Sequence, residues 1–171
     1  MIICGIDQSF THTAVVIFDL DTEEIIDLKL FKTLKKVGQI EYSPEERIFS
    51  IRDKVIEFVQ SHYCSIVFIE GLSLNSNSRT MRDLAGLYYV LLTTFIDKVI
   101  PCVSFPPLSV KAFAKKGNSS KEEMFDLIPK IDQDILLESG AKKTTGIYDL
   151  SDAYYIGKLG IYKFKNNELN I

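Results

Sequence analysis

Cysteine is scarce in this sequence, and long apolar runs are missing from it. The three cysteines, Cys4, Cys64 and Cys102, each lie in or beside a short apolar stretch. An odd number without metal-ligand spacing argues against a disulfide scaffold or a cysteine-bound zinc site, so reduced core thiols in a cytoplasmic protein are expected. The longest apolar stretch, around Leu87 to Phe95, is too short to span a bilayer. The first residues, MIICGID, have no basic segment before an apolar one, so we expect no signal peptide.

Positive charge is not in excess either. Lys and Arg number 20 against 23 Asp and Glu, which gives a net charge of −3. This net charge does not indicate nucleic-acid binding. It does not exclude such binding either, because the distribution of charge matters more than the sum. With 171 residues, 46% of them apolar, the chain is expected to form one domain over 1–165 with a frayed tail at 166–171.

Five apolar runs predict the strands of an α/β fold. Residues 2–7, 11–18 and 25–31 follow one another so closely that an antiparallel meander is expected. Residues 65–70 and 100–105 alternate with helical patterns, which is typical of parallel strands. We therefore expect a mixed five-stranded sheet, a three-stranded antiparallel meander plus two parallel strands, with helices on both faces.

Helices are predicted between and after these strands. Ser43 can cap a helix in which Pro44 takes the first position and Glu46 completes a capping box. A long helix is expected from Arg79 to Val99. The remaining expectations are short helices near 109–114 and 121–128, a loop-rich stretch at 131–147 and a last helix that begins near Tyr148.

Four acidic residues stand where strand ends and one helix face can meet. Asp7 ends the run MIICGID and Glu70 ends SIVFIEG, and strand ends are where open α/β sheets form their sites. Asp149 and Asp152 are three residues apart on the last helix, so their side chains lie roughly 60° apart around its axis. Carboxylates that meet at one point repel each other unless cations neutralise them, which predicts a Mg²⁺ or Mn²⁺ site.

Each of these acids also has a simpler interpretation. Asp7 can be a turn residue and Glu70 a surface acid at a strand end. Asp149 and Asp152 can be helix N-terminal acids that the macrodipole stabilises. Only their joint occurrence favours a site. His12 has no partner pattern in the sequence and is interpreted as a strand surface residue.

Four segments together resemble the RuvC family of Holliday junction resolvases, in a phage or low-GC bacterial form. They are GIDQSFTHTAVVIFD, IVFIEG, FPPLSVKAFAKKGNSSKEEM and DLSDAYYIG, in the family's order along nearly the whole chain. The resemblance implies a ribonuclease H-like fold and a metal-dependent endodeoxyribonuclease that resolves Holliday junctions by paired phosphodiester hydrolysis, leaving 5′-phosphate ends. It also implies two Mg²⁺ ions per site, for which Mn²⁺ substitutes, held by Asp7, Glu70, Asp149 and Asp152.

The resemblance extends to basic residues, with one departure. Lys111 and Lys121 match family positions near the scissile phosphate. The residues that we expect to contact DNA are Lys111, Lys121, Lys115, Lys116, Arg79 and Arg82, although a solvated helix face explains the last four equally well. The loop after Glu70, GLSLNSNS, lacks the aromatic residue that family members often carry there. Forks and three-way junctions are therefore expected as substrates beside four-way junctions.

The long helix predicts a partner chain. It is apolar nearly all round, so it must be covered on more than one side. The residues that we assign to a homodimer interface are Leu84, Tyr88, Leu91, Leu92 and Phe95. A twofold dimer would present paired sites to the two equivalent strands of a junction. A helix buried inside one monomer fits the pattern equally well.

Two rival functions remain open at this stage. The hairpin GIDQSFTHTAVVIFD faintly resembles the phosphate-binding hairpin of sugar kinases and actin-like ATPases, but those proteins need two such domains and a longer chain. The other rival is a branched-DNA binding module that keeps the fold without cleavage. The complete set of acids argues against it.

Overall fold

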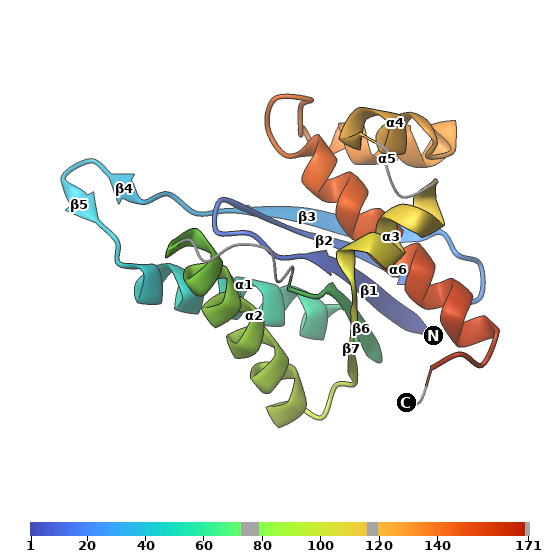
Figure 1. The fold of residues 1–171 in the computed structure, drawn as a ribbon, viewed down its shortest axis with the longest axis horizontal. Coiled ribbons are helices and arrows are strands. Elements are labelled where there is room, and N and C mark those ends of the chain that lie inside the picture. Colours follow the sequence, from blue (N-terminus) through green and yellow to red (C-terminus); the bar gives the residue numbers. More distant parts are fainter. Residues whose placement is uncertain (73–78, 116–119, 170–171) are drawn as a thin grey trace.

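A computed structural model of the chain describes residues 1–72, 79–115 and 120–169. At its centre is a five-stranded sheet in the order β3-β2-β1-β6-β7. Its strands are β1 (Ile2–Asp7), β2 (His12–Asp19), β3 (Ile25–Lys32), β6 (Ile66–Glu70) and β7 (Cys102–Phe105). β2 pairs antiparallel with β1 and β3, whereas β6 pairs parallel with β1 and β7. The predicted α/β sheet, a meander joined by two parallel strands, is confirmed (Figure 1).

Strand direction determines which residues share an edge of the sheet. β1, β6 and β7 run the same way, and β3 also does, because two antiparallel pairings separate it from β1. The strands therefore end at one edge with Asp7, Glu70, Phe105 and Lys32. The apolar runs of β1 and β6 are buried almost throughout, as expected of strands that helices cover on both faces.

Helices form a layer on each face of the sheet (Figure 1). One apolar cluster joins the sheet to α1 (Pro44–Ser61) and α2 (Arg79–Asp97). The other joins it to α6 (Ile147–Lys165), beside which lie α3 (Pro107–Ala114), α4 (Lys121–Asp126) and α5 (Lys130–Glu138). The predicted capping box is present at α1, where Ser43 and Glu46 exchange side-chain to main-chain hydrogen bonds of 2.7 and 3.1 Å.

β1 and α6 approach each other closely. A Cβ atom on Gly5 would lie 2.2 Å from the carbonyl oxygen of Ala153 and 2.5 Å from the amide nitrogen of Gly157. Only glycine fits at this crossing, because any side chain would collide with main-chain atoms of the helix. The crossing fixes the position of α6 relative to the strand that ends at Asp7.

Two parts of the fold differ from the prediction. Residues 130–138, expected to be loop-rich, form α5, although only Leu136 of that helix is fully buried. A short hairpin of β4 (Lys36–Val37) and β5 (Ile40–Glu41) projects from the end of β3, where no strand was predicted (Figure 1). Both elements bury little apolar surface, so they leave a weak periodic signal. None of the described helices has the length and apolarity to cross a bilayer.

Candidate active site

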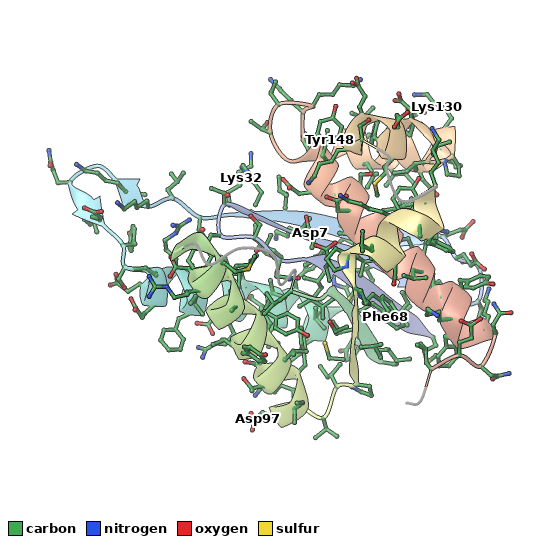
Figure 2. The ribbon with its side chains drawn as sticks, in the orientation of Figure 1. Asp7, Lys32, Phe68, Asp97, Lys130 and Tyr148 are labelled. Atoms are coloured by element: carbon green, nitrogen blue, oxygen red, sulfur yellow. The ribbon has the colours of Figure 1, made fainter. Side chains whose placement is uncertain are left out.

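Asp7 and Glu70 emerge next to each other at the edge of the sheet. The parallel ladder between β1 and β6 ends at the pair Ile6–Ile69, one residue before the two acids. Asp7 is buried and Glu70 is half-buried. Figure 2 places Asp7 near the centre of the molecule, where the sheet meets α6.

The first turns of α6 bring the other two acids to the same place. α6 begins at Ile147, directly after Gly146 in the left-handed conformation, and it carries Asp149 and Asp152 on its first turns. Both carboxylates act on Asp7, because their negative charges help to raise its pKa. All four acids therefore share one electrostatic environment, although they come from three separate stretches of the chain.

Burial and mutual repulsion disfavour the charged form of these acids. Burial, then the charges of Asp152 and Glu70, raise the pKa of Asp7 well above its usual value. Burial, followed by Asp152, raises the pKa of Glu70 to about 7. Burial also raises the pKa of Asp152. Acids whose pKa values are raised in this way are characteristic of functional sites, where a cation or a reacting group later compensates their charge.

Lys121 supplies part of the missing positive charge. Its Nζ atom lies 2.7 Å from Oδ2 of Asp152. Burial by itself would lower the pKa of Lys121, but the ion pair with Asp152 and the charge of Asp7 raise it above its usual value. Lys111 also lowers the pKa values of Glu70 and Asp152. The two lysines that match the family pattern thus both act on the predicted site.

The chemistry of the donors suits a hard divalent cation, which prefers carboxylate oxygens. Among the residues that the structure describes, however, no group of three or more His, Cys, Asp or Glu side chains is arranged to hold a metal ion. The assignment of Asp7, Glu70, Asp149 and Asp152 as metal ligands therefore stays a prediction. These residues suit a cation because their negative charges are in excess, and the ion pair of Lys121 with Asp152 compensates for them only in part.

Gln8 is a residue of this site that the sequence analysis missed. It is only 5% exposed, and its Nε2 donates a hydrogen bond of 2.8 Å to the main-chain oxygen of Glu70. This hydrogen bond joins the ends of β1 and β6 just beyond Ile6–Ile69, the last residue pair of their ladder. Its Oε1 atom is buried without a hydrogen-bond partner in the described part of the chain, which leaves a neutral oxygen beside the acids. Its place directly after Asp7 is the only signal in the sequence.

The loop that follows Gln8 is also held firmly. Arg47 of α1 donates a hydrogen bond of 2.6 Å to the carbonyl oxygen of Phe10, and its guanidinium lies 4.9 Å from the Phe10 ring centroid. The Thr33 hydroxyl donates to the same carbonyl oxygen. These contacts hold the β1–β2 connection, and through it the end of β1 that carries Asp7.

His12 also belongs to this neighbourhood. Its Nδ1 atom lies 3.8 Å from Oδ2 of Asp149, and the side chain is half-buried. The interpretation of His12 as a strand surface residue is therefore incomplete. The strand was predicted correctly, but the helix that packs against it could not be placed from the sequence.

Comparison with known proteins gives matches along the whole chain. No family model matches it. It is 26% identical over 169 residues to the crossover junction endodeoxyribonuclease RuvC of Ehrlichia canis, covering 98% of this chain and 99% of that protein. The protein of the same name from Ehrlichia ruminantium (strain Gardel) is 24% identical over 96% of this chain and 99% of its own.

Solved structures agree on the fold. RuvC of Thermus thermophilus, solved in complex with a Holliday junction substrate, superposes with a TM-score of 0.72 at 18% identity, over 97% of this chain and 96% of that one. The fowlpox virus resolvase, solved with Holliday junction DNA, gives a TM-score of 0.62 at 16% identity, over 96% and 99% of the two chains. The chain is therefore similar to RuvC proteins along almost its whole length. Its fold is the expected ribonuclease H-like fold.

The other basic residues expected to bind DNA lie in different settings within this RuvC-type fold. Lys115 pairs with Glu123 at 3.3 Å, so part of its charge is already neutralised. Arg82 is exposed on α2, and Arg79 is the first residue of that helix. Lys116 lies outside the described residues.

The apolar stripe of α2 is partly used inside one chain. Leu91 and Phe95 are fully buried in the cluster that joins α2 to α1 and the sheet, so they cannot form the surface of a dimer interface. This corrects the prediction for these two residues. Leu84, Tyr88 and Leu92 are half-buried. The periodic pattern identified an apolar helix, but it could not separate the face that packs on its own sheet from the outer face.

Proposed function

We propose that this chain is a metal-dependent, structure-selective endodeoxyribonuclease that resolves Holliday junctions by paired phosphodiester hydrolysis. The observation that carries the proposal is the gathering of Asp7, Glu70, Asp149 and Asp152 in one electrostatic environment at the edge of a RuvC-type sheet. The curated relatives matched over almost their whole length are named crossover junction endodeoxyribonucleases. We place the activity in the cytoplasm of a bacterial or phage-infected cell, in keeping with those bacterial relatives.

In this proposal the four acids have different roles in binding two metal ions. A pair of bound Mg²⁺ ions, or Mn²⁺ in their place, would lower the pKa of a water molecule and stabilise the departing 3′ oxygen. Asp7, whose pKa is raised by the charges of the other three carboxylates, would contribute a ligand to both ions. Glu70 and Asp152 would each hold one ion, and Asp149 would complete the ligands or orient the water. The water oxygen bonds to phosphorus while the bond from phosphorus to the 3′ oxygen breaks, leaving a 5′-phosphate and a 3′-hydroxyl.

Lys121 has two roles in this scheme. In the chain by itself it neutralises Asp152. If Asp152 instead held a metal ion, the Lys121 ammonium would be free to contact a phosphate oxygen of the scissile strand. Lys111, whose charge already acts on Glu70 and Asp152, is placed to do the same.

Branched DNA is the proposed substrate, including forks and three-way junctions. The sequence after Glu70 carries Leu72 and Leu74 but no aromatic residue, which favours looser selection among branched forms. A homodimer would cut two equivalent strands. With Leu91 and Phe95 buried, its interface is proposed to use the half-buried Leu84, Tyr88 and Leu92.

Incubation of the protein with end-labelled DNA tests the proposal. The substrates are a four-way junction, a three-way junction, a fork and a linear duplex, each with and without Mg²⁺. We expect cleavage of branched substrates only with the metal, and its loss in Asp7→Asn without any loss of thermal stability. Junction binding without cleavage at any Mg²⁺ or Mn²⁺ concentration would instead support the non-catalytic binding module.

A further inference from the structure

The lysines of this chain fall into two groups. Most of those that the structure describes form ion pairs with carboxylates: Lys35, Lys115, Lys121, Lys130, Lys143, Lys158, Lys163 and Lys165. The other seven form no ion pair within the described ranges. Four of these, Lys36, Lys98, Lys111 and Lys142, do not line the cavities between β3 and α1, and the other three, Lys29, Lys32 and Lys54, are exposed. These three lie together, around two neighbouring cavities between β3 and α1.

The cavities form one groove, which we call the β3–α1 groove. Their volumes are about 370 and 410 Å³, and Lys32 and Lys54 line both. The charged residues that line the groove are Lys29, Lys32, Lys54, Arg47, Glu46 and Glu57, so its walls carry two more positive than negative charges. The carboxylate of Glu46 is already engaged in the capping box of α1. The groove is therefore a positive surface on a chain whose net charge is −3.

The groove opens next to the candidate active site. β3 ends at the same edge of the sheet as β1, and Lys32 is the register partner of His12 on β2. His12 in turn lies 3.8 Å from the carboxylate of Asp149. Figure 2 shows Lys32 on the side of Asp7 that faces the β4–β5 hairpin. Lys121 approaches the same acids from α4, which packs against α6.

We propose that the β3–α1 groove binds the phosphate backbone of a DNA duplex that extends from the catalytic edge. The inference rests on the proposed function and adds a second DNA-contacting surface, which includes neither Lys111 nor Lys121. Lys32 and Lys54 line both cavities, so their ammonium groups can contact phosphates of one DNA backbone that runs along the groove. Unpaired ammonium groups on an exposed strand and helix bind such a backbone without reading its sequence.

The charge of the groove selects DNA over a second copy of this chain as the occupant. A copy would have to place an acidic surface there, while its own identical groove repels it. A duplex arm carries a dense negative charge and needs no such match. Lys29 is left out of the test, because its ammonium lies 5.6 Å from the Phe58 ring centroid and 5.8 Å from that of Phe31 and so supports the fold.

The test compares the double variant Lys32→Gln/Lys54→Gln with Lys98→Gln/Lys130→Gln, which removes the same charge from exposed positions outside the groove. Fluorescence anisotropy measures binding of a labelled four-way junction at increasing NaCl concentration, without divalent ions. The slope of log K against log salt concentration should become shallower by about 1.8 for the groove variant and stay near wild type for the control. Lys32→Arg/Lys54→Arg should restore the slope, and thermal unfolding should match wild type in all three.

The outcomes separate this inference from the proposed function. A groove variant whose salt slope equals that of the control overturns the inference, even if the wild type cleaves junctions. An unchanged salt slope with weaker self-association in sedimentation also overturns it, because the groove would then be a contact between copies. If the wild type binds junctions with the predicted dependence on the groove but never cuts them, the result supports the groove as a DNA-binding surface. The same result contradicts the proposed nuclease activity. A wild type that binds no DNA overturns both.

Discussion

Replacing Gly5 by alanine should disturb the site without touching any of its acids. The added methyl group would lie 2.2 Å from the carbonyl oxygen of Ala153 and 2.9 Å from the Cα atom of Gly157. Ordinary contacts between such atoms need about 3.5 Å. Because both neighbours are main-chain atoms, no side-chain rotation relieves the overlap, and α6 must move away from β1 by roughly 1 Å.

The cost follows from two opposing terms. Overpacking of a rigid core typically destabilises a protein by about 1–3 kcal/mol, and main-chain neighbours place Gly5→Ala toward the upper end of that range. The loss of backbone freedom in the unfolded chain returns about 0.4–1 kcal/mol. We expect a net loss of about 2 kcal/mol, or a melting temperature lower by about 4–8 °C in a chain of this size. Because α6 carries Asp149 and Asp152, a displacement near 1 Å should also lower the cleavage rate by roughly 100-fold.

Gly86→Ala is the matched control. Gly86 lies inside α2, and a methyl group there would meet only the flexible end of Ile48, at 3.3 Å. This variant should be more stable than wild type by about 0.5–1 kcal/mol, since alanine favours a helix interior, and it should cleave normally. Urea unfolding and single-turnover junction cleavage measure both effects. If Gly5→Ala unfolds and cleaves like wild type, the close crossing of β1 and α6 is not what positions the acids.

Three further predictions concern charge and hydrogen bonding at the site. Without metal, stability should fall as pH rises from about 4.5 to about 7, because Glu70 ionises in the unfolded chain first and its folded pKa is raised to about 7. In urea unfolding at each pH, Glu70→Gln should reduce this loss of stability by up to about 3 kcal/mol. If the stability of Glu70→Gln fell as steeply with pH as that of wild type, Glu70 would not be the group responsible. Gln8→Met should weaken Mn²⁺ binding, measured by calorimetry, by roughly tenfold. Gln133→Met is its control, because it also removes side-chain hydrogen bonds to main-chain oxygens; it should lower the stability and leave Mn²⁺ binding unchanged. Lys121→Met should bind Mn²⁺ more tightly without DNA, yet bind junctions with a salt slope shallower by about 0.9, and unchanged values of both would argue against its two roles.

Local patterns were sufficient for the sheet and for the start of α1. The meander is encoded by runs of period two separated by short turns, and the capping box of Ser43 and Glu46 acts within four residues. Such features need no knowledge of the rest of the chain. The positions of Asp7 and Glu70 followed from the rule that active sites form at the carboxyl ends of strands in open sheets.

Contacts between distant elements were not predictable in the same way. Leu91 and Phe95 look like an interface in the sequence, and only the packing of α2 on α1 and the sheet reveals that they are core residues. Gln8 is one polar residue among many until the end of β6 is placed beside it. The pairing of Lys121 with Asp152 joins residues 31 positions apart, across a segment with no periodic signal.

The electrostatics of the site indicate why folding tolerates so many acids in one place. Burial raises the pKa values of Asp7, Glu70 and Asp152, which favours the protonated acids and lowers their repulsion in the metal-free site. For Glu70 the pKa is raised to about 7, so this carboxyl is partly protonated near neutral pH. Lys121 offsets one further charge. A divalent cation must displace those protons, so its apparent affinity should increase with pH up to and beyond 7, the region where Glu70 ionises. In the proposed site, the acids that weaken the metal-free fold would also bind the cation, and cleavage would depend on the pH range in which they ionise.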